Sequence, residues 1–232
     1  MKLVYEGKAK RMYDLGDRYL MEFKDEVTAG DGAKRDKAPG KGALAAQLSA
    51  LLFSYLSSRG IPHHFIEAAG PTSLVVKKAS VIPVEVIVRF KAYGSYLKRM
   101  PAVRPLAEFK RPLVEFHLKD DKLHDPLVLE EDIIEAGLAE PQEVETTKRL
   151  ALAAASALRD LYGRANCDFV DVKFEFGRRD GLILVDEISG DTFRLLCDGE
   201  HLDKEYYRKT GDVAGLLKRY ERLLELTKTL LS

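Results

Sequence analysis

Residues 168–177, with the sequence DFVDVKFEFG, constrain the fold more than any other segment because charged and apolar side chains alternate along them. Side chains of an extended strand alternate between two faces, so we expect one apolar core face and one charged face here. The core face is expected to carry Val170, Val172, Phe174 and Phe176. The charged face is expected to carry Asp171, Lys173 and Glu175.

Residues 177–181, GRRDG, have the composition of a turn, so residues 182–188 are expected to return antiparallel and bring Asp186 toward the charged face. Pairing of Phe176 with Gly181 places Asp186 on that face. Pairing of Phe176 with Leu182 instead places Asp186 among apolar side chains. Because burying a lone carboxylate is costly, we expect the first register, or a bulge with the same effect.

Two or three carboxylates in one small region need a cation. Like charges about 4 Å apart repel by roughly 4 kcal/mol at an effective dielectric near 20. Lys173 supplies one cation, and a divalent metal would supply another; all-oxygen ligands suit magnesium, which usually takes only one or two protein carboxylates. Taken alone, the segment is equally consistent with the solvated face of a half-exposed hairpin.

Composition narrows the class of protein. The chain has 232 residues, enough for two lobes with a cleft between them, and its acids and bases balance at 37 each. We therefore expect neither nucleic acid nor a membrane as a partner. No apolar stretch approaches the length of a membrane span, so a cytoplasmic protein is expected. Cys167 and Cys197 lack metal-ligand spacing, and reduced thiols are expected rather than a disulfide.

The order of predicted elements indicates an α+β fold rather than a doubly wound sheet. Strands are expected at residues 2–6, 11–15, 18–24, 64–68, 73–78 and 83–90. Helices are expected at residues 43–58, 130–136, 143–162 and 212–231. Because proline cannot donate to a central ladder, Pro83 makes residues 79–82 a connector, and residues 98–126 are expected to be a polar excursion. The predicted domains are a β-rich lobe, residues 1–80, and an α+β lobe, residues 81–232.

Two further segments could bind anions. Gly7 allows close backbone approach at a turn where Lys8 and Lys10 offer positive charge, which suits phosphates; a solvated hairpin tip is the alternative. Arg89 and Ser95 could hold a phosphate or carboxylate, although Arg89 could equally be a strand-end arginine paired to an acid. His124 is expected to be structural or at the surface. The P-loop and dinucleotide-binding patterns both fail, because Arg35 occupies a position where each needs glycine.

Taken together and in order, these segments resemble the SAICAR synthetase family, also called phosphoribosylaminoimidazole-succinocarboxamide synthase. The resemblance rests on residues 5–10, 28–34, 83–95, 124–126, 171–177, 186–187 and 194–195. It implies an ATP-dependent ligase of purine biosynthesis that joins L-aspartate to the carboxylate of carboxyaminoimidazole ribonucleotide and releases ADP and phosphate. It also implies an ATP-binding lobe similar to a protein-kinase small lobe, facing an α+β lobe across the active-site cleft. We expect a homo-oligomer, with a dimer favoured.

The resemblance also implies roles for particular residues. ATP would be bound by Gly7, Lys8, Ala9, Lys10, Lys77 and Val81, and Mg²⁺ by Glu175 and Asp186. The ribonucleotide and other substrate groups would be held by Arg89, Ser95, Arg194, Asp31 and Asp191. The reacting centre would be lined by Lys119, Asp125, Asp171 and Lys173. Where the family commonly has tryptophan and aspartate after the Arg-Leu pair, this chain has Leu196, Cys197 and Asp198, which leaves the packing beside Arg194 open.

Two other functions share some of these features. A phosphotransferase would use the same glycine-lysine turn and acids but would phosphorylate a hydroxyl group. A nucleotide-binding regulatory module would need no turnover, and the presence of both Glu175 and Asp186 speaks against it. An aspartate-dependent release of phosphate separates the ligase from both.

Overall fold

Two antiparallel sheets form the framework of the computed structural model, which describes residues 1–29 and 34–232. The first sheet has the order β1-β2-β3-β7-β6, and its first three strands form the expected meander. Its strands are β1 (Lys2–Glu6), β2 (Lys10–Asp14), β3 (Arg18–Phe23), β6 (Phe65–Ala68) and β7 (Ser73–Lys77). The α+β class predicted from the sequence is confirmed.

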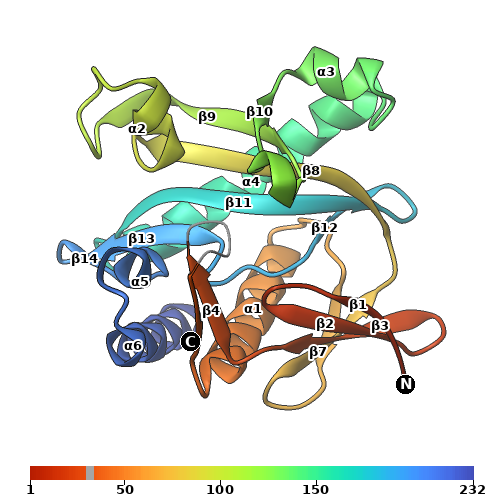
Figure 1. The fold of residues 1–232 in the computed structure, drawn as a ribbon, viewed down its shortest axis with the longest axis horizontal. Coiled ribbons are helices and arrows are strands. Elements are labelled where there is room, and N and C mark those ends of the chain that lie inside the picture. The colour runs from red at the N-terminus through yellow and green to blue at the C-terminus, as the bar shows by residue number, and fades with distance from the viewer. Residues whose placement is uncertain (30–33) are drawn as a thin grey trace.

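The second sheet has the order β10-β9-β8-β11-β13-β14. Strand β12 pairs with residues 175–178 of β11, beyond the residues that pair with β13. Its strands are β8 (Ser80–Lys91), β9 (Glu108–Leu118), β10 (Leu127–Val128), β11 (Asp168–Arg178), β12 (Leu182–Val185), β13 (Phe193–Cys197) and β14 (Glu200–His201). The long strand β11 crosses the middle of Figure 1, with β8 and β9 above it and the first sheet below. The charged strand of the sequence is therefore central to the molecule.

Helices cover these sheets and join them. The elements are α1 (Lys41–Ser58), α2 (Ser95–Arg99), η1 (Asp121–Leu123), α3 (Glu130–Glu135), α4 (Pro141–Gly163), α5 (Glu205–Thr210) and α6 (Val213–Leu231). Leu52 and Leu56 of α1 belong to the main core, beside Leu158 of α4 and Phe174 of β11. Ala45 of the same helix packs with the apolar side chains of the first sheet. Since α1 contributes to both cores, it fixes the two sheets relative to each other.

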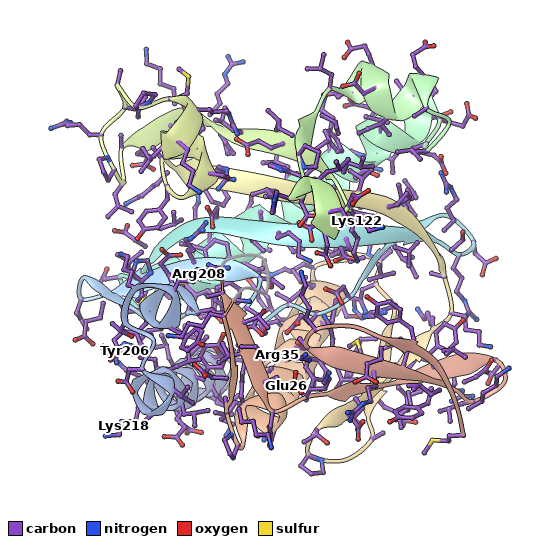
Figure 2. All side chains as sticks on the ribbon, in the orientation of Figure 1. Glu26, Arg35, Lys122, Tyr206, Arg208 and Lys218 are labelled. Carbon is purple, nitrogen blue, oxygen red and sulfur yellow. A yellow bond between two sulfur atoms is a disulfide. The ribbon has the colours of Figure 1, made fainter. Side chains whose placement is uncertain are left out.

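A short hairpin lies beside α5 and α6. It consists of β4 (Glu26–Ala29) and β5 (Lys34–Lys37), and Arg35 Nε donates to Glu26 Oε2 at 2.7 Å across it. Figure 2 shows this pair on the hairpin. Asp31, a predicted substrate contact, lies outside the described residues. No helix of residues 1–29 and 34–232 is long and apolar enough to cross a membrane.

Two predictions about segments in or beside which proline occurs are wrong. Residues 79–82 are not a connector, because β8 begins at Ser80; Pro83 lies where the pairing of β8 with β11 shifts register, a position that tolerates a missing donor. Residues 98–126 are not an irregular excursion, because they contain β9. The part of β9 around Pro112 has no partner strand on the side of β10, which pairs only with Phe116 and His117, so proline is tolerated at this edge.

The register predicted for the β11–β12 hairpin is also wrong. Phe176 pairs with Leu184 rather than Gly181, and the turn closes at Arg178 and Leu182. A continued strand would place Asp186 on the apolar face. Instead β12 ends at Val185 and Asp186 has a φ of 67°, so the chain turns and the carboxylate reaches the charged cluster by another route.

The core face of β11 differs from the prediction at one residue. Val172, Phe174 and Phe176 belong to the main core as expected, and so does Phe169, whereas Val170 is buried outside that cluster. The β11–β13 pairing shifts register between Phe169 and Asp171. An extra residue at such a shift reverses the alternation of faces on one side of it.

The expectation of reduced thiols is wrong. Cys167 and Cys197 form a disulfide with a Cα–Cα distance of 4.4 Å, across a sequence separation of 30. Their neighbours Asp168 and Leu196 are paired residues of β11 and β13, so strand pairing brings the cysteines together. After the Arg194-Leu195 pair, where the family commonly has tryptophan, Leu196 and Cys197 are both buried.

Candidate active site

One cavity of about 1200 Å³ lies between the two sheets. It is lined by all of the predicted site residues that the structure describes. These are Gly7, Lys8, Ala9, Lys10, Lys77, Val81, Arg89, Ser95, Lys119, Asp125, Asp171, Lys173, Glu175, Asp186, Asp191 and Arg194. Residues that are far apart in the sequence therefore line one cavity, and strands β8 and β11 contribute Val81, Arg89, Asp171, Lys173 and Glu175 to it.

The first charged group in this cavity, which we call the lysine end, comprises Lys10, Lys119, Lys173, Glu85, Glu175, Asp186 and Glu187. Lys173 Nζ lies 2.7 Å from Glu175 Oε1, 3.5 Å from Asp186 Oδ2 and 3.1 Å from Glu85 Oε1. Glu175 and Asp186 thus both contact the ammonium group of Lys173, which agrees with the prediction that their carboxylates lie close together.

Two further lysines complete the lysine end. Lys10 on β2 donates to Asp186 and, at 2.8 Å, to Glu187 Oε1, while Lys119 at the end of β9 donates to Glu175. His64 Nε2 lies 2.8 Å from the carbonyl oxygen of Asp186 and so helps to hold its left-handed backbone. Three ammonium groups therefore face four carboxylates, which leaves the lysine end with an excess of negative charge.

The lysines keep the buried acids ionised. Burial would raise the pKa of Asp186, but Lys10 and Lys173 outweigh burial and hold that pKa far below its usual range. Burial would likewise raise the pKa of Glu175, but the charges of Lys173 and Lys119 outweigh burial and lower that pKa. Conversely, the carboxylates overcome the effect of burial on Lys173 and raise its pKa. Both acids are anionic at neutral pH and can bind a cation.

The second charged group, which we call the arginine end, includes Arg89, Arg194, Arg208, Asp171 and Ser95 of the cavity lining. It also includes Glu115, Glu205 and Arg99, which do not line the cavity but form ion pairs within the group. Arg89 is only 1% exposed. Its Nε donates to Glu115 Oε2 at 2.9 Å, Nη1 to Asp171 Oδ2 at 2.7 Å and Nη2 to Ser95 Oγ at 2.8 Å. Three different partners therefore fix the guanidinium plane.

Asp171 also links Arg89 to Arg194, because Arg194 Nη1 donates to the same Oδ2 atom at 2.7 Å. Gly94 allows this approach: its φ is 59°, and an added Cβ would lie 2.8 Å from Arg194 Nη2. Burial would raise the pKa of Glu115, but His117 and Arg89 lower it to about 2. With Arg99 on Glu115 and Arg208 on Glu205, four guanidinium groups face three carboxylates.

The turn between β1 and β2 forms another wall of the cavity. Gly7 N donates to Lys10 O at 2.9 Å, and the buried Lys24 donates to Glu6 Oε1 at 2.9 Å and to Gly7 O at 3.3 Å. Lys8 Nζ lies 2.7 Å from Asp121 Oδ1 of the second sheet's loop. Hydrogen bonds from Lys24 thus fix the turn, and an exposed ion pair between Lys8 and Asp121 connects it to the second sheet.

Asp191 anchors a third charged group that includes two residues missed in the sequence. Lys41 donates to Asp191 Oδ2, the Tyr220 hydroxyl donates to Oδ1 at 2.7 Å, and Lys204 Nζ lies 3.7 Å from Oδ1. Glu115 was also missed because it falls in the segment predicted to be irregular. No sequence pattern identifies Lys41 or Lys204, since their partners are distant along the chain.

The chain is similar to known proteins over nearly its whole length. A family model described as SAICAR synthetase matches residues 3–223. The phosphoribosylaminoimidazole-succinocarboxamide synthase of Pyrobaculum aerophilum is 70% identical over 98% of this chain and 97% of its own. The structure of the synthase from Ehrlichia chaffeensis has a TM-score of 0.93 at 34% identity and covers 98% of both chains. A type-2 SAICAR synthetase in complex with ADP has a TM-score of 0.91 at 38% identity and covers 96% of both chains.

Proposed function

Because the chain belongs to the SAICAR synthetase family, whose members are ligases of purine biosynthesis, we propose that it joins L-aspartate to the carboxylate of carboxyaminoimidazole ribonucleotide at the expense of ATP. The observation that carries this proposal is the charge distribution of the cavity. One end has surplus carboxylates that can bind a metal, and the other has surplus guanidinium groups that can bind a phosphate. A nucleotide and a second phosphorylated substrate can therefore meet in one cavity.

The reaction follows from the chemistry of the substrates. A carboxylate is a poor acylating agent, so ATP first converts it to an acyl phosphate, with ADP leaving. The aspartate amine then attacks the acyl carbon and displaces phosphate. Neither step needs a side-chain nucleophile, whereas both need charge stabilisation and alignment.

ATP is assigned to the wall made by the β1–β2 turn. Gly7, Lys8, Ala9 and Lys10 would cover the phosphates, Lys77 would lie beside the nucleotide, and backbone groups near Val81 would hold the adenine. The ADP complex of the structurally similar SAICAR synthetase supports a nucleotide site in this fold. Lys8 suits the role because its present partner is an exposed aspartate, which a phosphate can replace at small cost.

Glu175 and Asp186 would hold Mg²⁺. Within the described part of the chain no group of three or more potential metal ligands occurs, but Mg²⁺ commonly uses only one or two carboxylates together with water and substrate phosphates. The surplus negative charge of the lysine end fits this ion. When bound, Mg²⁺ would neutralise charge on the phosphates of ATP.

Arg89, Ser95 and Arg194 are assigned to the ribonucleotide phosphate, with Asp31 and Asp191 as further substrate contacts. Lys119, Asp125, Asp171 and Lys173 would line the reacting centre between the two ends. Asp171 supports both arginines, and Lys173 and Lys119 can stabilise negative charge that develops on the transferred phosphoryl group. The location in the cytoplasm, the dimer, the division at residue 80 and the likeness to a kinase lobe stay predictions.

A substrate-omission assay tests the proposed function. The protein is supplied with ATP, Mg²⁺, L-aspartate and the carboxylated ribonucleotide, and phosphate release is measured with each omitted in turn. We expect release to require all four. Release that persists without aspartate would favour an ATPase, and ADP formation without free phosphate would favour a phosphotransferase. Nucleotide binding without any turnover would favour a regulatory module.

A further inference from the structure

Lys204 lies in the cavity wall directly before α5. Its side chain is 15% exposed, and its backbone N–H donates to Gly190 O at 2.9 Å, which fixes it beside the loop that carries Asp191. One turn further along α5, Arg208 also lines the cavity; Figure 2 labels it on that helix. Lys204 is therefore a buried amine with access to the substrates.

The carboxylate nearest to Lys204 is already bound by other groups. The two oxygens of Asp191 already accept hydrogen bonds from Lys41 and Tyr220, so Lys204 remains 3.7 Å away as a second ammonium against one carboxylate. Among the described residues its Nζ makes no hydrogen bond to a side chain. Of the two lysines, Lys204 has the weaker contact with the Asp191 carboxylate.

Several other groups act on Lys204. Arg208 of α5 and Lys41 of α1 repel its charge, while Asp191 and, more remotely, Glu187 attract it. Burial is the largest effect, and it lowers the pKa of Lys204 to about 8. Lys10 and Lys173, by contrast, have pKa values raised by their carboxylates. A neutral amine is thus accessible near physiological pH at Lys204, in contrast to Lys10 and Lys173.

We propose that Lys204 is the base that accepts the proton of the aspartate α-ammonium group before amide formation, an inference that rests on the proposed ligase function. The ammonium N–H bond breaks and its proton moves to the Lys204 Nζ lone pair. The freed amine forms the C–N bond, the acyl C–O bond breaks, and the departing phosphate takes the second amine proton. Asp191 stabilises the ammonium of Lys204 that results.

An alternative role is binding of a substrate carboxylate or phosphate by the positively charged form of Lys204. Two substitutions separate the roles. Lys204→Arg keeps a positive charge that cannot be lost, whereas Lys204→Met keeps the length of the side chain without charge. A base is lost in both variants. An anion-binding group is largely retained in the arginine variant.

The test measures kcat/KM for aspartate against pH in the wild-type enzyme and both variants. In the wild type we expect it to rise with pH and to level above about 8, because increasing pH converts Lys204 to its neutral form. Both variants should lose on the order of 100-fold at neutral pH, the usual scale for general base catalysis. They should recover toward the wild-type rate at a pH where aspartate's own amine is neutral. The exposed Lys218→Met is the matched control and should behave as wild type.

A second measurement replaces aspartate with hydroxylamine, whose nitrogen is largely neutral at neutral pH. We expect Lys204→Met and Lys204→Arg to form ADP with hydroxylamine at rates within a few-fold of the wild-type rate. Near-normal aspartate kinetics in the arginine variant, or an equal loss with both amines at every pH, would overturn the proposal. A wild-type enzyme whose phosphate release does not depend on aspartate would instead overturn the proposed function itself.

Discussion

The two ends of the cavity hold their charges in different ways. At the lysine end, three ammonium groups come from separate strands and each contacts one to three carboxylates. At the arginine end, Arg89 alone meets three partners in fixed directions, and Asp171 joins it to Arg194. An ammonium is a point charge that can change partners by rotation, whereas a guanidinium is a planar group with directed donors.

This difference suits different tasks. Groups that must follow a phosphoryl group as it moves from ATP to a carboxylate need to exchange partners, which lysines can do. A ribonucleotide phosphate does not react, so a preorganised pair of arginines can hold it in one place throughout. The surplus of one carboxylate at the lysine end and of one guanidinium group at the arginine end agrees with a metal at the first and an anion at the second.

The largest effect is expected from removing a carboxylate at the lysine end. Asp186→Asn and Glu175→Gln replace an ionised oxygen by a neutral group of similar shape. We expect kcat to fall by roughly 100-fold or more, since such electrostatic contacts contribute on that scale. Circular dichroism should remain that of the wild type. Full activity in a folded variant would remove both residues from the metal site.

The next largest effect is expected from removing the disulfide beside the arginine end. Cys167 precedes β11 and Cys197 ends β13, so their disulfide joins the two strands that carry Asp171 and Arg194. In the loop-entropy model a bond across 30 residues stabilises by about 3 to 4 kcal/mol. We expect a Cys167→Ser, Cys197→Ser double variant to lose about 10 °C in Tm by scanning calorimetry.

The same double variant also sharpens the comparison between the two ends. Loosening β11 against β13 should raise KM for the ribonucleotide by a few-fold and leave KM for ATP unchanged. The control is the wild-type protein after treatment with reductant, which should show the same shift in Tm. An unchanged Tm in both samples would contradict a stabilising disulfide.

A smaller effect is expected from Arg89→Lys. Lysine keeps the positive charge but cannot reach Glu115, Asp171 and Ser95 together, so one of the buried acids loses its partner. We expect KM for the ribonucleotide to rise by roughly 10-fold to 100-fold and the affinity for ATP to remain within two-fold of the wild-type value. Isothermal titration with each ligand measures both. Equal weakening of the two ligands would make Arg89 structural.

The smallest effect is expected at the exposed ion pair between Lys8 and Asp121, whose side chains are 43% and 68% exposed. Such pairs contribute less than about 1 kcal/mol. Asp121→Asn should therefore lower KM for ATP slightly because it releases Lys8, whereas Lys8→Met should raise it a few-fold. A KM that moves in the same direction in both variants would show that Lys8 does not bind the nucleotide.

The sequence predicted the location of the site better than the details of its construction. Lys173 and Glu175 were placed correctly because the alternation of a strand depends only on local geometry. Asp186 lies near the predicted charged cluster because its backbone is left-handed, and not because of the predicted register. The register was predicted wrongly because the length of the turn and the end of the strand cannot be determined from composition alone.

Other features depended on contacts between distant residues. Cys167 and Cys197 meet only because β11 pairs with β13, and Lys41 reaches Asp191 across a separation of 150 residues. Pro83 was interpreted as the end of a connector and residues 98–126 as a polar excursion, yet Pro83 and Pro112 each lie at a place in a strand where a ladder donor is not needed. Which positions tolerate proline is set by the neighbouring strands, which a local sequence pattern does not reveal. Strand β9 and the role of Glu115 were therefore not predicted.

The transfer of oxygen from substrate to phosphate tests the central claim most directly. The ribonucleotide is prepared with its reacting carboxylate labelled with ¹⁸O and turned over with ATP and aspartate in unlabelled water. A ligase that forms an acyl phosphate must release phosphate containing one labelled oxygen, detectable by mass spectrometry. Phosphate that carries no label, released while the ribonucleotide is consumed, would contradict the activation of the carboxylate by ATP and with it the division of roles between the two ends of the cavity.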